Sequence, residues 1–180
     1  MKIVVRAGER REINFLRTSG EQEDLQVELV GAGASVKITH IVLGNGKEKS
    51  DIKVAVYHKA PETESEVIIR SAVNDQAQLV YRGLIDMAEE ARGAKGYQSG
   101  KGLLLNRGAV VDILPELKIR NNDVRCSHGV TTTHLDDLAL FYLRSRGLDE
   151  FNARRLAVLG FLRGGLDLPA EISQRLGRVI

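Results

Sequence analysis

Hydrophobic and polar residues alternate in short segments along the first 130 residues of the chain. In LQVEL at 25–29 and VKIT at 36–39, every second side chain is apolar. A period of two is typical of β-strands with one buried face and one face in water. Glycine, asparagine and charged residues separate the segments. The pattern predicts strands at 2–5, 12–16, 25–30, 35–43, 52–58, 66–72, 78–87, 103–106, 110–114, 116–119 and 123–126.

Such a series of strands fits a sandwich, a barrel or a β-solenoid, and the period alone does not choose between them. Asn-Gly hairpin turns, which antiparallel meanders usually contain, are rare, with one clear case at 44–46. The later strands are short and are joined by small corners at 106–108 and 121–122. Both observations favour a solenoid. The glycine-rich interval 88–102, AEEARGAKGYQSGKG, is predicted to be a loop.

After residue 132 the hydrophobic period changes to that of a helix. Leu135, Leu138 and Tyr142 have helical spacing, and Gly147 stands where a helix would end. Thr133, with Asp136 three residues later, resembles a capping box at the start of this helix. The pattern predicts a β domain at 1–132 and a helical domain at 133–180.

Two more helices are predicted in this second part. Asp149 can cap a helix whose apolar side contains Phe151, Val158 and Leu162 and which ends at Gly164. A third, short helix starts near Pro169, because proline is favoured in the first helical turn. With fewer than 50 residues, this part is expected to pack on the β domain or to bind a partner.

Composition excludes several function classes. The 180 residues are 43% hydrophobic and 28% charged, with a net charge of only +2, which does not indicate a nucleic-acid partner. Four Phe, four Tyr and no Trp leave few aromatic platforms for single-stranded bases. The N-terminus lacks the features of a signal peptide, and no apolar run reaches the ~20 residues that span a bilayer. We therefore expect a cytoplasmic protein without a membrane partner.

Cys126, the only cysteine, and His128 are the candidate chemical residues. Two residues apart in a strand, they point to the same face and could share one metal or one proton. One cysteine allows no internal disulfide and suits a reducing compartment. Alternatively, Cys126 is a small buried hydrophobe, or a nucleophile with His128 as its base, although no third orienting group can be identified. His134 could complete a metal site, but we expect it on the surface at a helix start.

The segment 115–147, PELKIRNNDVRCSHGVTTTHLDDLALFYLRSRG, resembles the C-terminal signature of the SufB/SufD family of iron-sulfur cluster assembly proteins, and is more similar to SufD. YRGLIDM at 81–87 and GLLLN at 102–106 extend the resemblance over about the last two thirds of the chain. It implies a right-handed parallel β-helix followed by a small helical region. Family members are usually more than twice as long, so their N-terminal region is expected to be absent or short here.

The resemblance also implies a role and partners. The chain would be a non-enzymatic, SufD-like subunit of a SufBCD-type complex, joined through β-helix edges to another copy or to a SufB-like chain. Cys126 and His128 match a cysteine and a histidine near that interface, and would hold a transient iron-sulfur cluster, with no cofactor bound permanently. The alternative is a structural dimerisation module without cluster chemistry.

A SufC-like ABC ATPase is the other implied partner. The chain has no Gly-x4-Gly-Lys-Ser/Thr loop, so the partner would bind the ATP. The resemblance implies that the ATPase binds the helical region, and we expect it within 134–168. The three consecutive large apolar residues at 141–143 cannot all face one side of a helix, so at least one is expected to meet a partner or the end of the β-helix. The arginines there are either solvated or paired with acidic groups of the ATPase. The expected contact residues are Leu138, Phe141, Tyr142, Leu143, Arg144, Arg146 and Phe161.

Overall fold

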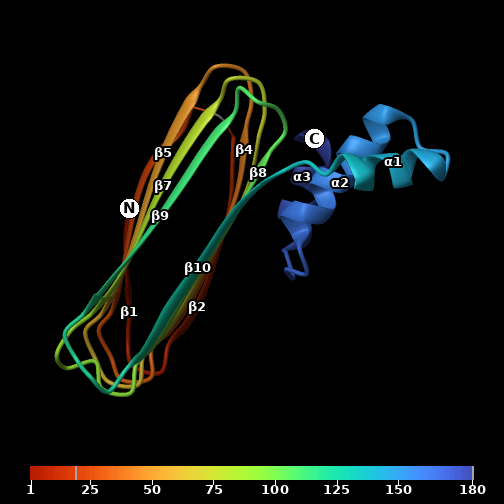
Figure 1. Ribbon diagram of the computed structural model, residues 1–180. Coiled ribbons are helices and arrows are strands. Elements are labelled where there is room, and N and C mark those ends of the chain that lie inside the picture. The colour runs from red at the N-terminus through yellow and green to blue at the C-terminus, as the bar shows by residue number, and fades with distance from the viewer. Residues whose placement is uncertain (19, 180) are drawn as a thin grey trace.

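The computed structural model describes residues 1–18 and 20–179, with side chains except those of 173 and 176–179; Ile180, at the end of the predicted helical domain, lies outside it. Strands precede helices along the chain (Figure 1). The strands are β1 (Lys2–Val5), β2 (Arg10–Arg17), β3 (Gln22–Leu29), β4 (Ser35–Gly44), β5 (Lys49–His58), β6 (Glu64–Val73), β7 (Gln78–Met87), β8 (Lys95–Leu104), β9 (Val110–Ile119) and β10 (Arg125–His134). The helices are α1 (Asp137–Ser145), α2 (Glu150–Arg163) and α3 (Ala170–Val179).

The strands form a parallel β-solenoid, as predicted. The odd-numbered strands make one sheet, in the order β1-β3-β5-β7-β9, and the even-numbered strands make the other, in the order β2-β4-β6-β8-β10. All neighbouring strands are parallel, and the chain crosses from one sheet to the other after each strand, so successive coils stack in register (Figure 1). This topology excludes the sandwich and the barrel built from antiparallel strands.

The main core lies between the two sheets. Side chains alternate along each strand, and those that point inward are buried: Leu25 and Val27 in β3 and Val54 and Val56 in β5 are at most 2% exposed. Strand partners in register share a face, so an apolar residue stacks on an apolar residue of the next coil. The period of two in the sequence thus becomes a continuous apolar column along the solenoid.

The predicted loop at 88–102 holds only as far as residue 94 and is wrong from Lys95 onward, because Lys95–Leu104 forms strand β8 between β6 and β10. Its inward positions are mostly glycines, since the opposite sheet fills the space in front of them. A Cβ on Gly100 would lie only 2.7 Å from the Cγ2 of Ile113. Glycine therefore stands where the period-two pattern expects an apolar residue, and the hydrophobic signal of the strand is lost.

The last coil also differs from the prediction. The segments 110–114 and 116–119 are one strand, β9, which includes Pro115; proline is tolerated there because β9 is the edge of its sheet. Strand β10 continues to His134. The capping box of Thr133 and Asp136 is therefore wrong: Thr133 belongs to β10, and Asp136 is the N-cap, its carboxylate accepting a hydrogen bond from the Leu138 amide at 2.9 Å.

Helices α2 and α3 cover part of the outer face of the even-strand sheet, and α1 lies farthest from the sheets (Figure 1). Asp149 caps α2 and the left-handed Gly164 ends it, and Gly147 follows α1 in a left-handed conformation, as the sequence predicted. One apolar cluster joins the helices to the sheet. It contains Leu16, Ile41, Leu43, Ala72 and Leu103 of the strands and Val158, Leu162 and Ile172 of the helices.

Within the described part of the chain, no helix combines the length and the apolar character needed to cross a membrane.

Candidate functional site

Cys126 and His128 lie on the inner side of β10, the edge strand of the even-strand sheet. Their partners in β8 are Gly96 and Gln98, which face the interior of the solenoid. Residues paired in this way share a face, so both candidate side chains point toward the space between the sheets. Because β10 belongs to the last coil, this space is open at the site.

The thiol of Cys126 is half-buried over a small apolar cluster at the end of the solenoid. Ile85, Met87, Ala91 and Ala94 form this cluster, and Leu117 and Val124 pack against it with Cys126. Burial raises the pKa of the Cys126 thiol. An activated nucleophile has a lowered pKa, so this setting does not favour the nucleophile reading of Cys126.

The structure does not gather a complete metal site from this chain. Among the described residues, no group of three or more His, Cys, Asp or Glu side chains is placed to hold a metal ion. His134 ends β10, six residues after His128, and a strand rises about 3.3 Å per residue, so the two lie roughly 20 Å apart. His134 is therefore no third ligand beside His128.

The two edges of the even-strand sheet differ in charge. β2, at one edge, contains three arginines and a glutamate among its eight residues. β10, at the other edge, is RCSHGVTTTH, with one arginine at its first position and no lysine, aspartate or glutamate. Charged side chains on an edge strand discourage pairing with another chain. β2 is thus protected against pairing, and β10 is not.

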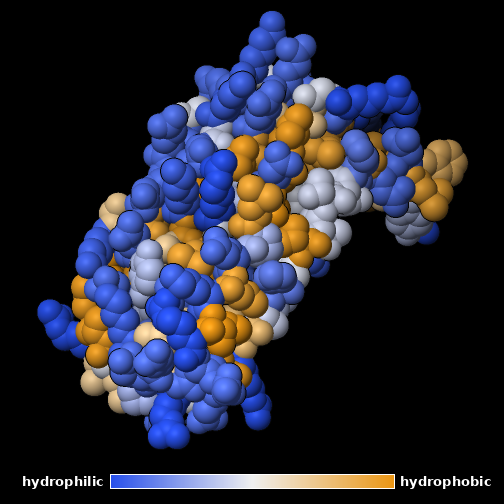
Figure 2. All heavy atoms as spheres, turned by 60° about the vertical axis from the view of Figure 1, so that its left-hand side comes forward, coloured by the Kyte–Doolittle hydropathy of each residue, from blue (hydrophilic) through white to orange (hydrophobic). Residues whose placement is uncertain are grey.

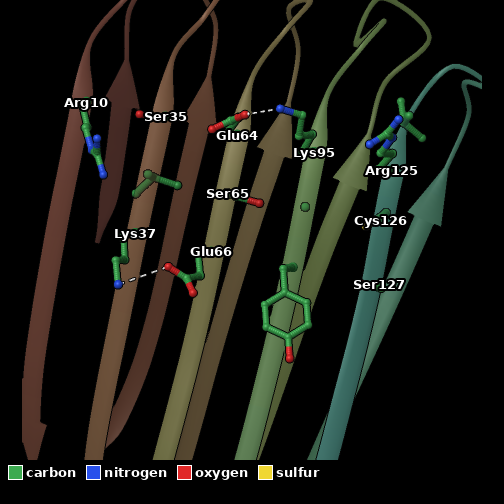
Figure 3. Close-up of a pocket in the computed structure, with 14 residues that line it drawn as sticks. Arg10, Ser35, Lys37, Glu64, Ser65, Glu66, Lys95, Arg125, Cys126 and Ser127 are labelled. Carbon is green, nitrogen blue, oxygen red and sulfur yellow. Dashed lines mark hydrogen bonds and ion pairs between the residues drawn. The ribbon is translucent and has the colours of Figure 1, made fainter. Parts of the chain in front are cut away.

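A groove on the outer face of the even-strand sheet runs beside the start of β10 (Figure 3). Four of its charges form pairs along the coils: Lys37 lies 3.2 Å from Glu66, and Lys95 lies 2.7 Å from Glu64. Cys126 borders the groove, but its sulfur lies near the inner side of Gly96. The groove is a charged face of the sheet, lined by these two pairs and by Arg10 and Arg125.

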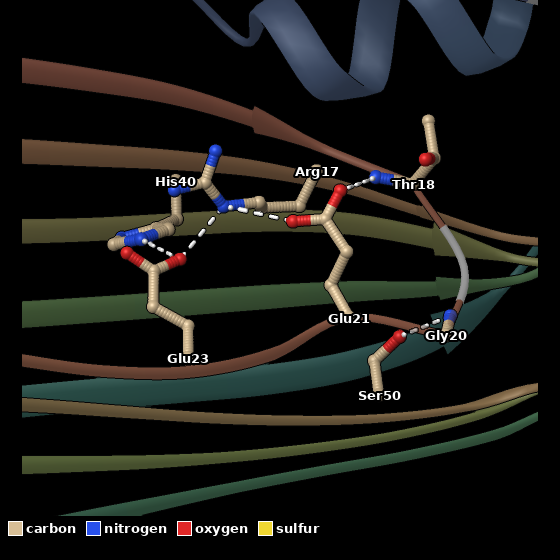
Figure 4. A network of polar contacts seen from close by, with 7 residues as sticks. All are labelled: Arg17, Thr18, Gly20, Glu21, Glu23, His40 and Ser50. Carbon is tan, nitrogen blue, oxygen red and sulfur yellow. Dashed lines mark hydrogen bonds and ion pairs between the residues drawn. The ribbon is translucent and has the colours of Figure 1, made fainter.

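Two histidines outside the candidate site, His40 and His58, are fully buried. His40 belongs to a polar network near the N-terminal edge (Figure 4), where its Nε2 lies 3.5 Å from the Glu23 carboxylate. Arg17 donates to the same carboxylate at 2.7 Å. Burial acts to raise the pKa of Glu23, but His40 and Arg17 outweigh it and lower the pKa to about 2. The alternation Val36, Ile38, His40 already marks His40 as inward-facing.

The expected docking residues divide into two groups. Leu138, Phe141 and Tyr142 are 73%, 69% and 55% exposed; hydrophobic side chains are visible at the end of the molecule where α1 lies (Figure 2). Leu143 is half-buried, Arg144 lies 3.7 Å from Glu150, and the Arg146 guanidinium stands 5.2 Å from the centre of the Tyr142 ring.

Phe161 differs from the other expected docking residues, because it packs against the cluster that joins the helices to the sheet. Phe151, predicted on the apolar side of α2, is instead 68% exposed, and Leu156 is 48% exposed. The exposed apolar surface therefore includes α2 as well as α1. The sequence pattern did not predict this exposure, because which side of α2 is buried depends on where the helix packs on the sheet.

Comparison with known proteins agrees with this architecture. The family model for the SufBD core domain of SUF system FeS cluster assembly matches residues 16–161. The chain belongs to the SufB/SufD family. The iron-sulfur cluster assembly protein SufD of Escherichia coli K12 is 30% identical over 140 residues, which are 78% of this chain and 33% of that protein.

Staphylococcal members of the family are similarly related. An iron-sulfur cluster assembly SufBD family protein of Staphylococcus saprophyticus is 29% identical over 153 residues, and one of Staphylococcus aureus USA300 is 28% identical over the same length. Each of these matches covers 84% of this chain and 33% of the relative. The chain thus spans about a third of the length of the relatives it matches.

Proposed function

We propose that this protein is a SufD-like, non-enzymatic subunit of a cytoplasmic iron-sulfur cluster assembly complex. The observation that carries the proposal is that β10 is an edge strand without protecting charges after its first residue, with Cys126 and His128 on its inner side. A second chain of the same fold joins at β10 and brings its own ligands to the open end of the solenoid.

The pairing itself follows from the backbone. No strand pairs with the outer edge of β10 within the described residues, so N–H and C=O groups along ten residues are available to a second chain. Adding a strand at such an edge gives affinity through main-chain hydrogen bonds. The partner is another copy of this chain or a longer SufB-like chain.

The cluster is cargo at this interface. A thiolate and an imidazole are suitable ligands for iron. Two copies of this chain supply two thiolates and two imidazoles, whereas the described residues of one chain hold no group of three or more candidate metal ligands. Because burial raises the pKa of Cys126, its thiol is protonated in the free protein and loses its proton when iron binds. Ligand binding, rather than nucleophilic attack, suits this thiol.

The second partner is a SufC-like ABC ATPase, which binds the helical part. Leu138, Phe141 and Tyr142 of α1 and Phe151 of α2 are large apolar side chains exposed on the helical part, and exposed apolar residues are a common property of interaction sites. Arg144 and Arg146, at the end of α1, attract acidic groups of the partner. Phe161 belongs to α2 and packs that helix against the apolar cluster on the sheet.

Anaerobic reconstitution with iron and sulfide tests the ligands. We expect Cys126→Ser and His128→Ala each to lower the cluster absorbance per chain, and the double variant to abolish it. His134→Ala is the matched control, because His134 lies on the same side of the same strand and should have no effect. Unchanged absorbance in the double variant would reject the ligands. A wild-type dimer that binds no cluster would instead support a structural dimerisation module.

Co-purification with a SufC-like ATPase tests the docking surface. We expect the exposed double substitution Leu138→Ser/Phe141→Ser to abolish binding without loss of folding. Leu114→Ser, at a 51% exposed apolar residue of β9, is the control and should bind normally. Equal binding by both variants would reject the surface on α1.

A further inference from the structure

Gln98 is a buried amide whose polar atoms have no partner. Its side chain is 1% exposed, and neither its amide nitrogen nor its amide oxygen has a hydrogen-bond partner among the described residues. A buried amide in this state is unfavourable, so a partner that becomes available at the site would stabilise it.

The position of Gln98 identifies that partner. Gln98 is paired with His128 in the ladder between β8 and β10, so the two side chains stand next to each other in adjacent coils, on the same face. In the opposite sheet, a Cβ on Gly83 would lie 1.7 Å from the Nε2 of Gln98. The amide therefore reaches across the interior into space that only glycine leaves free. The coil that carries His128 is the last one, so Gln98 forms the floor of the open end.

We propose that Gln98 is a positioning residue for His128. The hydrogen bond between the two side chains is not formed in the structure, where the amide oxygen of Gln98 has no partner among the described residues. When the His128 side chain turns toward its ladder partner, this oxygen accepts a hydrogen bond from one ring nitrogen, and the other ring nitrogen is left without a proton and directed to the iron. Such a partner fixes the tautomer and orientation of a ligand histidine. This inference rests on the proposed function, because it gives Gln98 a role in orienting His128, the proposed iron ligand. Its test measures the tautomer of the His128 ring in the metal-free protein.

His134 is a built-in reference for this test. It lies on the same strand and the same side as His128, but its ladder partner is Leu104, which offers no hydrogen bond from its side chain. We would record nitrogen NMR spectra of histidine-labelled protein at a pH well above 7, where exposed rings are neutral. The His128 signals are assigned with His128→Ala. We expect one tautomer to predominate at His128 and a mixture, as in an exposed ring, at His134.

Substitutions at Gln98 separate hydrogen bonding from packing. Gln98→Met keeps the length of the side chain without an acceptor, and should give His128 the tautomer mixture of His134. Gln98→Glu keeps an acceptor and should preserve the bias. Gly83→Ala displaces the amide from the opposite sheet and should weaken the bias while both polar residues remain. For the metal, we expect roughly tenfold weaker Fe(II) binding by Gln98→Met.

Two results would overturn the inference. One is a wild-type His128 with the same tautomer mixture as His134. The other is an unchanged His128 spectrum in Gln98→Met, with folding checked by thermal unfolding. If the tautomer bias depends on Gln98 but His128→Ala retains all the iron, the hydrogen bond stands and the ligand role of His128 in the proposed function is rejected.

Discussion

The sulfur of Cys126 lies 3.1 Å from the point where a Cβ on Gly96 would stand. The two residues are partners in the ladder between β10 and β8, and the same point lies 2.7 Å from the Cε of Met87. Because residue 96 has no Cβ, there is room for both the Cys126 thiol and the Met87 side chain. The half-buried state of Cys126 depends on a residue one coil away.

We expect Gly96→Ala to lower the free energy of unfolding by about 1–3 kcal/mol, because the added methyl group overpacks a filled space. It should also displace Cys126 and speed its alkylation. Gly129→Ala is the control: Gly129 lies on β10, and its Cβ would meet no atom within 4 Å, so the change should stay within about 0.5 kcal/mol. Equal effects of the two substitutions in urea unfolding would contradict this reading.

The reactivity of Cys126 should be low at neutral pH. Since burial raises the thiol pKa and the thiolate is the reactive form, we expect slower alkylation in the folded protein than in the urea-unfolded chain. The rate should keep rising with pH beyond the ordinary thiol range. Rapid alkylation below pH 7 would instead indicate an activated nucleophile and favour a Cys/His enzyme.

His58 should make the fold sensitive to acid. Its ring lies between the hydroxyls of Thr63 and Ser65, each 2.8 Å away, and burial lowers its pKa to about 4. The unfolded histidine, with a pKa of about 6.5, binds a proton first as the pH falls. Its contribution to stability is therefore complete above about pH 6.5 and is lost toward pH 4, by about 3 kcal/mol in all.

Urea unfolding across this pH range measures the effect. His58→Gln should flatten the dependence of the unfolding free energy on pH. Some pH dependence of the unfolding free energy should remain in this variant because of His40, whose pKa is also lowered by burial. His134→Gln, at an exposed histidine, should leave the dependence as in the wild type. A wild-type protein equally stable at both ends of the range would refute the prediction.

Leu162 should anchor the helical part to the solenoid. It is fully buried in the cluster between α2 and the even-strand sheet. We expect Leu162→Ala to cost about 2–5 kcal/mol in unfolding free energy, the usual effect of a cavity in a packed core. Phe151→Ala, at an exposed position of the same helix, should cost no more than about 0.5 kcal/mol. A separate early unfolding transition of the helices in the wild type would contradict a shared core.

The sequence by itself determined most of the strands, the order of β before α, and the helix ends at Gly147, Asp149 and Gly164. These features are local: alternation within a strand and a cap at a helix end depend on neighbours a few residues apart. The spacing of Cys126 and His128 likewise placed both side chains on one face. The resemblance to the SufB/SufD family was carried by a continuous motif, and the family match agrees with it.

Only the tertiary structure decided what lies beside these residues. Strand β8 escaped prediction because the side chain of Ile113, in the next coil, fills the space in front of Gly100. Gln98 was predicted to lie in a loop, yet the ladder places it beside His128 of the next coil. Stacked coils bring together residues far apart in the chain, so the neighbours of the site follow from the register of the solenoid, which no local pattern contains.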